Sequence, residues 1–197
     1  MHLLFIDGSY RDGGVTDSIL KLLTEEAKRL GASVETVHLR NYPIEFCLNC
    51  RECTQQSGSQ PGHCVIDDGM HALIEKIETA DGLVLASPTN FGTVTAVFKR
   101  FMERLVPYAY WPWGTPAPKK RKQGSALKKA VLVTSSAAPS ILARIGFNTR
   151  SVLKKTAQTV GAKTVAIIDI GMVSQTPDPK LSKSECKTIK KAVLKLI

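Results

Sequence analysis

The stretch Asp7-Gly8-Ser9-Tyr10-Arg11-Asp12-Gly13-Gly14-Val15-Thr16-Asp17-Ser18 lies between a short apolar run and an amphipathic run. The apolar run, Leu3 to Ile6, is typical of a buried strand, and the amphipathic run has helical spacing. A strand that passes through a glycine-rich turn into a helix can bind an anion, because unpaired backbone N–H groups and the positive end of the helix dipole meet there. The sequence therefore predicts a phosphate site, although an ordinary strand–helix turn can have the same composition.

Several side chains of this turn strengthen the phosphate interpretation. Ser9, Thr16 and Ser18 offer hydroxyl donors, and Arg11 offers a positive charge. The glycines, Gly14 among them, allow the backbone to approach a ligand closely because they carry no Cβ.

Length and composition indicate a single α/β domain over residues 1–197. The chain is 43% apolar and 22% charged, which is ordinary for a globular protein. The first apolar run reaches Asp7 too early for a signal peptide. The longest uncharged stretch, residues 82–98, contains a proline, an asparagine and two glycines, which makes it a poor membrane span. We expect a cytoplasmic protein with no membrane association.

The net charge of +10 is unevenly distributed along the chain. Residues 1–98 hold 7 Lys/Arg and 13 Asp/Glu, a net charge of −6, whereas residues 99–197 hold 20 and 4, a net charge of +16. A half this basic is compatible with a polyanionic ligand or with a solvated face. Basic residues without interleaved aromatic residues or a binding module are weak support for nucleic acid, so we expect no nucleic-acid partner.

Strand-like and helix-like segments alternate along the chain. Five apolar segments have strand character: residues 3–6, 33–39, 82–87, 130–134 and 164–170. One helix is expected to run from the end of the fourth strand loop to about Val160. Two excursions interrupt the alternation, at residues 40–66 and 106–127. This pattern predicts a three-layer α/β fold, with helices on both faces of a parallel sheet in the strand order 2-1-3-4-5.

In such a sheet, ligands bind outside the carboxyl ends of the strands. The loops at residues 8–16, 87–93 and 134–139 follow the first, third and fourth strands, which are neighbours in the predicted order. We therefore expect these three loops to meet at one crevice.

Two motifs carry a resemblance to a known family. Gly8-Ser9-x-Arg11-x-x-Gly14-x-Thr16 resembles the phosphate loop of NAD(P)H-dependent FMN reductases and iron–sulfur flavoproteins, which have the flavodoxin-like fold. Ser87-Pro88-Thr89-Asn90-Phe91-Gly92, followed by Lys99 and Glu103-Arg104, resembles their second flavin loop and its helix. The resemblance covers residues 2–170. It departs at Gly14, where many members have Ser, and at Asn90, where many have Tyr.

The resemblance implies an FMN-dependent NAD(P)H oxidoreductase that passes hydride through the flavin to a quinone, azo or similar small-molecule acceptor. It implies a homo-oligomer, dimer or tetramer, in which one subunit covers the flavin of another. The cofactor-binding residues expected on this basis are Ser9, Arg11, Gly14, Thr16, Asp17, Ser18, Pro88, Thr89, Asn90, Phe91, Gly92, Thr134, Ser135 and Ser136. No catalytic side chain is expected, because the flavin carries the chemistry. We interpret His38, His63 and His71 as surface or packing residues.

Four cysteines are crowded into the first excursion, as Cys47-x-x-Cys50-x-x-Cys53 and, ten residues later, Cys64. In a cytosolic protein this crowding favours metal or redox chemistry over structural disulfides. Iron–sulfur flavoproteins carry a compact cluster motif at this place, usually with a shorter last spacer. The four thiols are compatible with an iron–sulfur cluster, with tetrahedral zinc, or with no metal.

The second excursion combines aromatic and basic residues. Its aromatic rings could stack on the flavin, contact a partner subunit or fill a core: Tyr108, Tyr110, Trp111 and Trp113. The run Lys119 to Lys122 could attract the 2′-phosphate of NADPH or remain a solvated loop. Two alternative functions stay open: an electron carrier in which a cluster feeds the flavin, and a non-catalytic module that binds zinc and nucleic acid.

Overall fold

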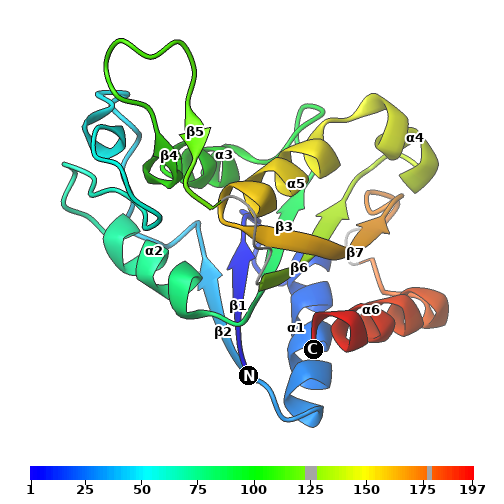
Figure 1. Ribbon diagram of the computed structural model, residues 1–197. Coiled ribbons are helices and arrows are strands. Elements are labelled where there is room, and N and C mark those ends of the chain that lie inside the picture. The colour runs from blue at the N-terminus through cyan, green and yellow to red at the C-terminus, as the bar shows by residue number, and fades with distance from the viewer. Residues whose placement is uncertain (123–127, 177–178) are drawn as a thin grey trace.

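A five-stranded parallel sheet forms the centre of the computed structural model, which describes residues 1–122, 128–176 and 179–197 (Figure 1). Its strands are β1 (His2–Asp7), β2 (Ser33–His38), β3 (Gly82–Pro88), β6 (Lys128–Ser135) and β7 (Ala162–Ile170). They are ordered β2-β1-β3-β6-β7, and every pair is parallel. The short strands β4 and β5 lie outside this sheet, so the order is the predicted 2-1-3-4-5, and the prediction is confirmed.

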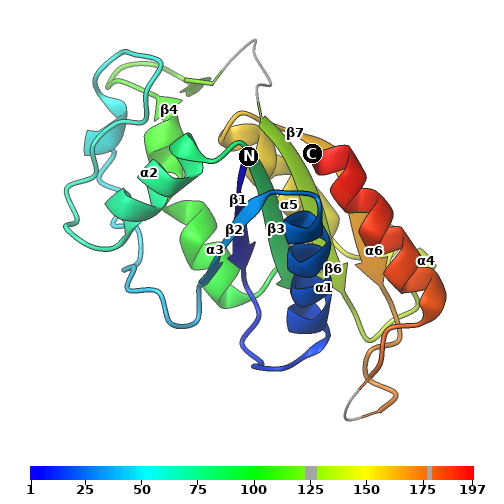
Figure 2. The same cartoon turned by 90° about the horizontal axis from the view of Figure 1, so that it is seen from below.

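Helices cover both faces of the sheet, as Figure 2 shows. Helices α1 (Val15–Arg29) and α6 (Lys183–Leu196) pack on one face, and α2 (Met70–Thr79), α3 (Ala96–Glu103) and α5 (Thr149–Thr159) pack on the other. Each of these helices presents a buried apolar stripe to the sheet. Strand β3 is buried from both sides, which explains its uninterrupted apolar sequence. No helix in the described ranges is both long and apolar enough to span a bilayer.

The prediction of one long helix reaching Val160 is wrong. The chain instead forms α4 (Ser140–Gly146), leaves the helical conformation at Phe147, and begins α5 at Thr149. Helix α4 has no buried residue, so no packing opposes the helix-weakening effect of Gly146. The break has a structural consequence, because the Asn148 N–H donates to the Gly92 carbonyl at 2.7 Å.

The two excursions pack against each other beside α2 and α3 (Figure 1). The Trp111 N–H donates to the Thr54 carbonyl at 2.9 Å. The Arg51 guanidinium lies 3.7 Å from the ring centroid of Trp111 and 4.3 Å from that of Trp113. These two indoles therefore hold the cysteine excursion by cation–π contacts. The Tyr108 ring lies in the core, which is one of the three alternatives given for these aromatic residues.

Some side chains of the basic run Lys119 to Lys122 make structural contacts. The antiparallel strands β4 (Ala109–Tyr110) and β5 (Lys119–Lys120) pair within this excursion. Arg121 donates to the carbonyls of Pro107, Ala109, Gly58, Cys53 and Gln56. Lys122 forms an ion pair with Glu78. Residues 123–127, the last part of the excursion predicted at 106–127, lie outside the described residues.

A buried ion pair joins the end of the cysteine excursion to α3. Arg104, which is 1% exposed, forms a bidentate pair with Asp68, with N···O distances of 2.6 and 3.0 Å. Its guanidinium also donates to the Glu45 carbonyl at 2.9 Å. Burial tends to raise the pKa of the Asp68 carboxyl, but the hydrogen bonds from Arg104 and from two backbone N–H groups outweigh burial, and the pKa is lowered.

This pair should make the stability of the fold depend on pH. Because the pKa of Asp68 in the folded chain lies below its ordinary value of 3.8, its contribution is complete above about pH 4 and is lost as the pH falls through the lowered pKa. Asp68→Asn should lower the free energy of unfolding by about 3 kcal/mol at neutral pH, because it leaves a buried guanidinium without its counter-charge. Urea unfolding at pH 7 and pH 3 measures both effects. The exposed neighbour provides a control, Asp67→Asn, which should cost less than about 0.5 kcal/mol. Equal losses in the two variants would contradict this prediction.

Candidate functional site

The three loops at the carboxyl ends of β1, β3 and β6 lie together. The Gly8 N–H donates to the Ala86 carbonyl at 2.8 Å, and the Thr95 hydroxyl donates to the Gly8 carbonyl at 2.6 Å. The Thr89 N–H donates to the Ser135 carbonyl at 2.7 Å. Each loop is therefore hydrogen-bonded to the strand or loop beside it, and the three lie together at the carboxyl edge of the sheet.

The first loop places the start of α1 beside the third loop. The first helical hydrogen bond runs from the Ser18 N–H to the Gly14 carbonyl at 3.0 Å, so the N–H groups of residues 15–17 precede the helical ladder. The Thr16 hydroxyl is buried and lies 3.5 Å from the Ser135 hydroxyl of the third loop. The positive end of this 15-residue helix is therefore next to two buried hydroxyl groups, that of Thr16 in its own first turn and that of Ser135.

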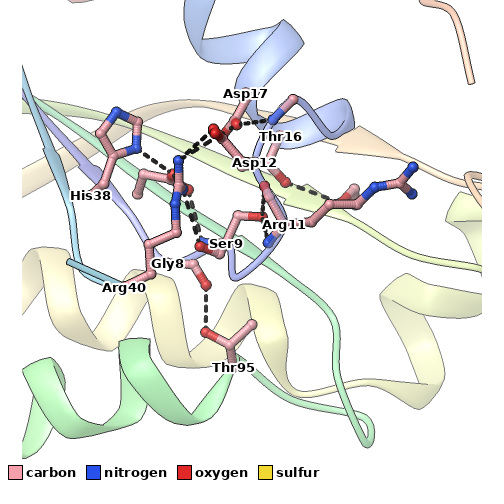
Figure 3. A network of polar contacts seen from close by, with 12 residues as sticks. Gly8, Ser9, Arg11, Asp12, Thr16, Asp17, His38, Arg40 and Thr95 are labelled. Atoms are coloured by element: carbon pink, nitrogen blue, oxygen red, sulfur yellow. Dashed lines mark hydrogen bonds and ion pairs between the residues drawn. The ribbon is translucent and has the colours of Figure 1, made fainter. Parts of the chain in front are cut away.

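Close packing fixes the path of the first loop. A Cβ at Gly8 would lie 2.8 Å from the Phe98 Cβ, so only glycine allows the loop to rest on α3. The methylene groups of Arg11 pack against Gly14, with its Cδ 3.4 Å from the position of an added Cβ. Figure 3 shows the Arg11 side chain extending away from Arg40 and His38.

Several predicted hydroxyl groups are already engaged by other groups of the chain. The Ser9 hydroxyl accepts the Arg11 N–H at 3.2 Å, and the Ser18 hydroxyl donates to the Gly14 carbonyl at 3.2 Å. Thr89 pairs with the hydroxyl groups of Thr134 at 3.3 Å and Thr149 at 2.9 Å. These contacts shape the loops: Thr89 and Thr134 join the second and third loops, and Thr16 and Ser135 join the start of α1 to the third loop.

An ion-pair network that the sequence analysis missed lies under the first loop (Figure 3). Asp7 is fully buried, and its Oδ2 lies 2.8 Å both from His38 Nδ1 and from Arg40. Arg40 also contacts Asp12 at 2.9 Å and donates to the Ser9 carbonyl at 3.3 Å. His38, interpreted from sequence as a surface or packing residue, therefore lies beside the first loop. The predicted strand order was the available signal, because it puts the carboxyl end of β2 next to that of β1.

Asp17 completes this network from the first turn of α1. Its Oδ2 accepts the Gly13 N–H at 2.6 Å. Burial, together with the nearby Asp7 charge, raises the pKa of Asp17 against the opposing effects of Gly13 and Arg40. Within the described residues, Asp7, Asp17 and His38 are the one group of ligand-type side chains within 4.8 Å of one another. Arg40 supplies the positive charge there, because it lies 3.8 Å from the Asp17 carboxylate and 2.8 Å from the Asp7 carboxylate.

The second loop turns tightly and presents an exposed ring. Asn90 and Thr93 exchange two backbone hydrogen bonds of 2.8 and 3.1 Å. Between them, Phe91 and Gly92 both have positive φ angles, of 47° and 75°. The Phe91 ring is fully exposed at 103%, an unusual position for a large apolar side chain in a left-handed conformation.

The four cysteines of the first excursion gather around Cys53. A Cβ at Gly62 would lie 1.9 Å from the Cys53 carbonyl oxygen, so the ten-residue spacer folds back onto Cys53 and returns Cys64 to its side. Burial, together with the nearby Cys64, Cys47 and Cys50, raises the pKa of the Cys53 thiol to about 11. Arg104 lies 3.6 Å from the Cys64 sulfur.

The thiols are not arranged for tetrahedral zinc. With zinc–sulfur bonds of about 2.3 Å, four ligand sulfurs lie roughly 3.8 Å apart, whereas no three of these described thiols lie within 4.8 Å of one another. All five cysteines of the chain are free thiols. Two non-glycine residues that bracket Cys50, Asn49 and Arg51, have positive φ angles of 55° and 64°. Such strain is typical of loops that are shaped for a function.

Comparison with known proteins places this geometry in a family. Residues 1–171 match the NADPH-dependent FMN reductase family. An iron-sulfur flavoprotein of Archaeoglobus fulgidus is 36% identical over 104 residues, which cover 53% of this chain and 48% of that protein. A putative NAD(P)H-dependent FMN-containing oxidoreductase of Bacillus subtilis is 30% identical over 104 residues, covering 53% of this chain and 51% of that protein. The chain thus spans about half the length of these curated relatives.

A solved structure supports the same fold. An FMN-dependent NADH-azoreductase from Bacillus anthracis, solved in complex with FMN, superposes with a TM-score of 0.73 at 13% identity, covering 100% of this chain and 99% of that one. At this identity the likeness establishes the flavodoxin-like fold alone. The match across residues 1–171, together with the three joined loops, shows that this chain belongs to the NADPH-dependent FMN reductase family.

Proposed function

We propose that this protein is an FMN-dependent NAD(P)H oxidoreductase that reduces a quinone, azo or similar small-molecule acceptor. The observation that carries the proposal is the junction of the first and third loops. There the start of α1 and the buried hydroxyls of Thr16 and Ser135, 3.5 Å apart, converge from positions far apart in sequence. Backbone N–H groups and hydroxyls in this arrangement suit a phosphate monoester.

The residues present fit FMN. The start of α1, Thr16 and the Arg11 guanidinium would hold the phosphate, with Ser9 and Gly14 shaping the loop around it. The second and third loops would contact the ring: Pro88, Thr89, Asn90, Phe91, Gly92, Thr134, Ser135 and Ser136. When bound, FMN supplies the two-electron chemistry that side chains lack.

The chain partly compensates the acidic residues of the first loop. Arg40 pairs with Asp7 and Asp12, and Asp17 is engaged by the Gly13 N–H. Without the Arg40 charge, the carboxylates of Asp7 and Asp12 would lose this ion pair next to the loop that is proposed to hold the phosphate. We therefore infer that Arg40 positions the loop and lowers its negative charge.

A visible spectrum of the native protein with an anaerobic NADPH titration tests the function. The protein should be yellow or become yellow with added FMN, and NADPH should bleach the flavin bands. A colourless protein that does not take up FMN would overturn the proposal. Zinc in such a protein, with nucleic-acid affinity that falls steeply with salt, would instead support a non-catalytic module.

The phosphate assignment predicts a difference between two variants. Arg11→Ala should raise the Kd for FMN about tenfold, because a charge-assisted contact with the phosphate is lost. Cys50→Ser changes an exposed thiol of the first excursion and should leave the Kd for FMN unchanged. Quenching of FMN fluorescence measures both values. An equal rise in the two variants would show that the phosphate is misplaced.

We also propose that the four cysteines hold an iron–sulfur cluster, which would make the chain an electron carrier as well. The chain path that returns Cys64 to the side of Cys53, with Cys47 and Cys50 nearby, supports this second candidate. The Arg104 guanidinium lies 3.6 Å from the Cys64 sulfur, and the Arg121 guanidinium lies 3.4 Å from the Cys53 carbonyl oxygen. These cations would offset the negative charge of ligating thiolates.

Anaerobic reconstitution with ferrous iron and sulfide tests the cluster. The wild-type protein should turn brown and retain iron after desalting. Cys53→Ser should lose the colour, because Cys53 is central to the four thiols, whereas Cys186→Ser on α6 should retain it. Iron retention that is equal in both variants, or uptake of zinc alone, would contradict a cluster.

We propose that the protein forms a homodimer in the cytoplasm, where its free cysteines would stay reduced. An apolar groove of about 370 Å³ lies between α3 and α5, with Phe91, Val94, Met102 and Val152 in its wall. Apolar surface of this kind favours association with a second copy.

Sedimentation velocity tests the dimer. The wild-type protein should sediment as a dimer or a larger assembly, and Ala96→Glu should shift it toward monomer by placing a charge in this groove, where Ala96 is exposed. Leu194→Glu, at a residue that is 60% exposed on α6, should leave the assembly intact. A monomeric wild-type protein would contradict the proposal.

A further inference from the structure

A basic cleft lies between the end of α4 and the first turns of α5. It has a volume of about 620 Å³, within the range of small-molecule sites. Four cationic side chains line it, namely Arg144, Arg150, Lys154 and Lys155, and its lining contains no carboxylate. Nothing in the fold or in the flavin assignment requires these charges.

The cations of this cleft exceed their counter-charges. Arg144 and Arg150 share one carboxylate, Asp169, at 3.0 and 3.3 Å. Lys154 and Lys155 are exposed, and neither has an ion-pair partner within the described residues. Four positive charges therefore face one negative charge, which leaves a surplus of three. A concave surface with this surplus attracts an anion that carries several charges.

The chain segment that lines the cleft is hydrogen-bonded to the second loop, and the flavin ring is proposed to lie beside that loop. The Asn148 N–H donates to the Gly92 carbonyl at 2.7 Å, and the Thr149 and Thr89 hydroxyls lie 2.9 Å apart. Phe147 lies 3.7 Å from the position of an added Cβ at Gly92. A ligand in the cleft can thus extend from the basic residues toward this loop.

The other basic run of the chain is less suited to such a ligand. Arg121 is saturated by backbone carbonyls, and Lys122 is paired with Glu78. Arg121 also lies beside the cysteine excursion. Lys119 and Lys120 of that run are exposed, so the two places carry a similar surplus of charge, but the cleft at α4 and α5 is concave and lies next to the second loop.

We propose that this cleft binds the phosphorylated adenosine end of NADPH, with Lys154 and Lys155 selecting its 2′-phosphate over the hydroxyl of NADH. The inference rests on the proposed oxidoreductase function and assigns its electron donor. Arg144 and Arg150 contribute charge for the pyrophosphate, and the apolar side chains of Ile145 and Phe147 at the cleft offer surface for the adenine.

Steady-state kinetics of the FMN-loaded protein test the selection. The double variant Lys154→Gln/Lys155→Gln should raise the KM for NADPH about tenfold or more, with kcat and the KM for NADH nearly unchanged. The matched control, Lys187→Gln/Lys191→Gln, removes two exposed lysines one turn apart on α6 and should leave both KM values unchanged. A KM that rises equally for NADPH and NADH, or for neither, overturns the proposal.

A binding measurement separates this inference from the proposed function. Calorimetry with adenosine 2′,5′-bisphosphate should show about tenfold weaker binding to the lysine double variant than to wild type, while adenosine 5′-monophosphate should bind both proteins alike. This result in a protein that reduces no acceptor supports the cleft and refutes the oxidoreductase function. An active reductase whose bisphosphate affinity is unaffected by the two lysines keeps its function and loses the assigned cleft.

Discussion

The parallel pairing of β1, β3 and β6 is the constraint on which the rest of the structure depends. In this register Asp7 lies opposite Ala86, and Pro88 lies opposite Ser135, so three chain reversals begin at the same edge of the sheet. Because parallel strands require crossover connections, each reversal leads into a helix or toward one. Hydroxyl groups, helix-terminal N–H groups and turn glycines are thereby concentrated at one place without any long loop reaching across the molecule.

Much of this arrangement could be predicted because it follows from apolar periodicity. Uninterrupted apolar runs such as Leu83 to Ala86 identify buried strands, and the turn residues after them identify one common edge. The role of Arg40 could not be found in the same way, because a single arginine after a strand has no local signature. The break near Gly146 was missed for a similar reason: the sequence is compatible with helix on both sides, and the Asn148–Gly92 contact is tertiary.

Arginine side chains organise the parts of the molecule that have little regular structure. Arg51 stacks between two indoles, Arg121 binds five carbonyls, and Arg104 closes a buried ion pair. A planar guanidinium can satisfy several acceptors in fixed directions, which a lysine cannot. The excursions thus obtain defined positions from charge and hydrogen bonds, in place of the apolar core that holds the sheet.

The return of the chain at Gly62 separates the position of Cys64 from the length of the segment before it. Gly62 is held by its N–H bond to the Pro107 carbonyl at 2.9 Å, and Cys64 is held by Arg104, whereas residues 56–60 between Cys53 and this anchor are exposed. Within that bulge, Arg121 binds the Gln56 and Gly58 carbonyls. The position of Cys64 beside Cys53 thus depends on this return of the chain, and sequence spacing alone is a poor measure of whether two cysteine sets are the same.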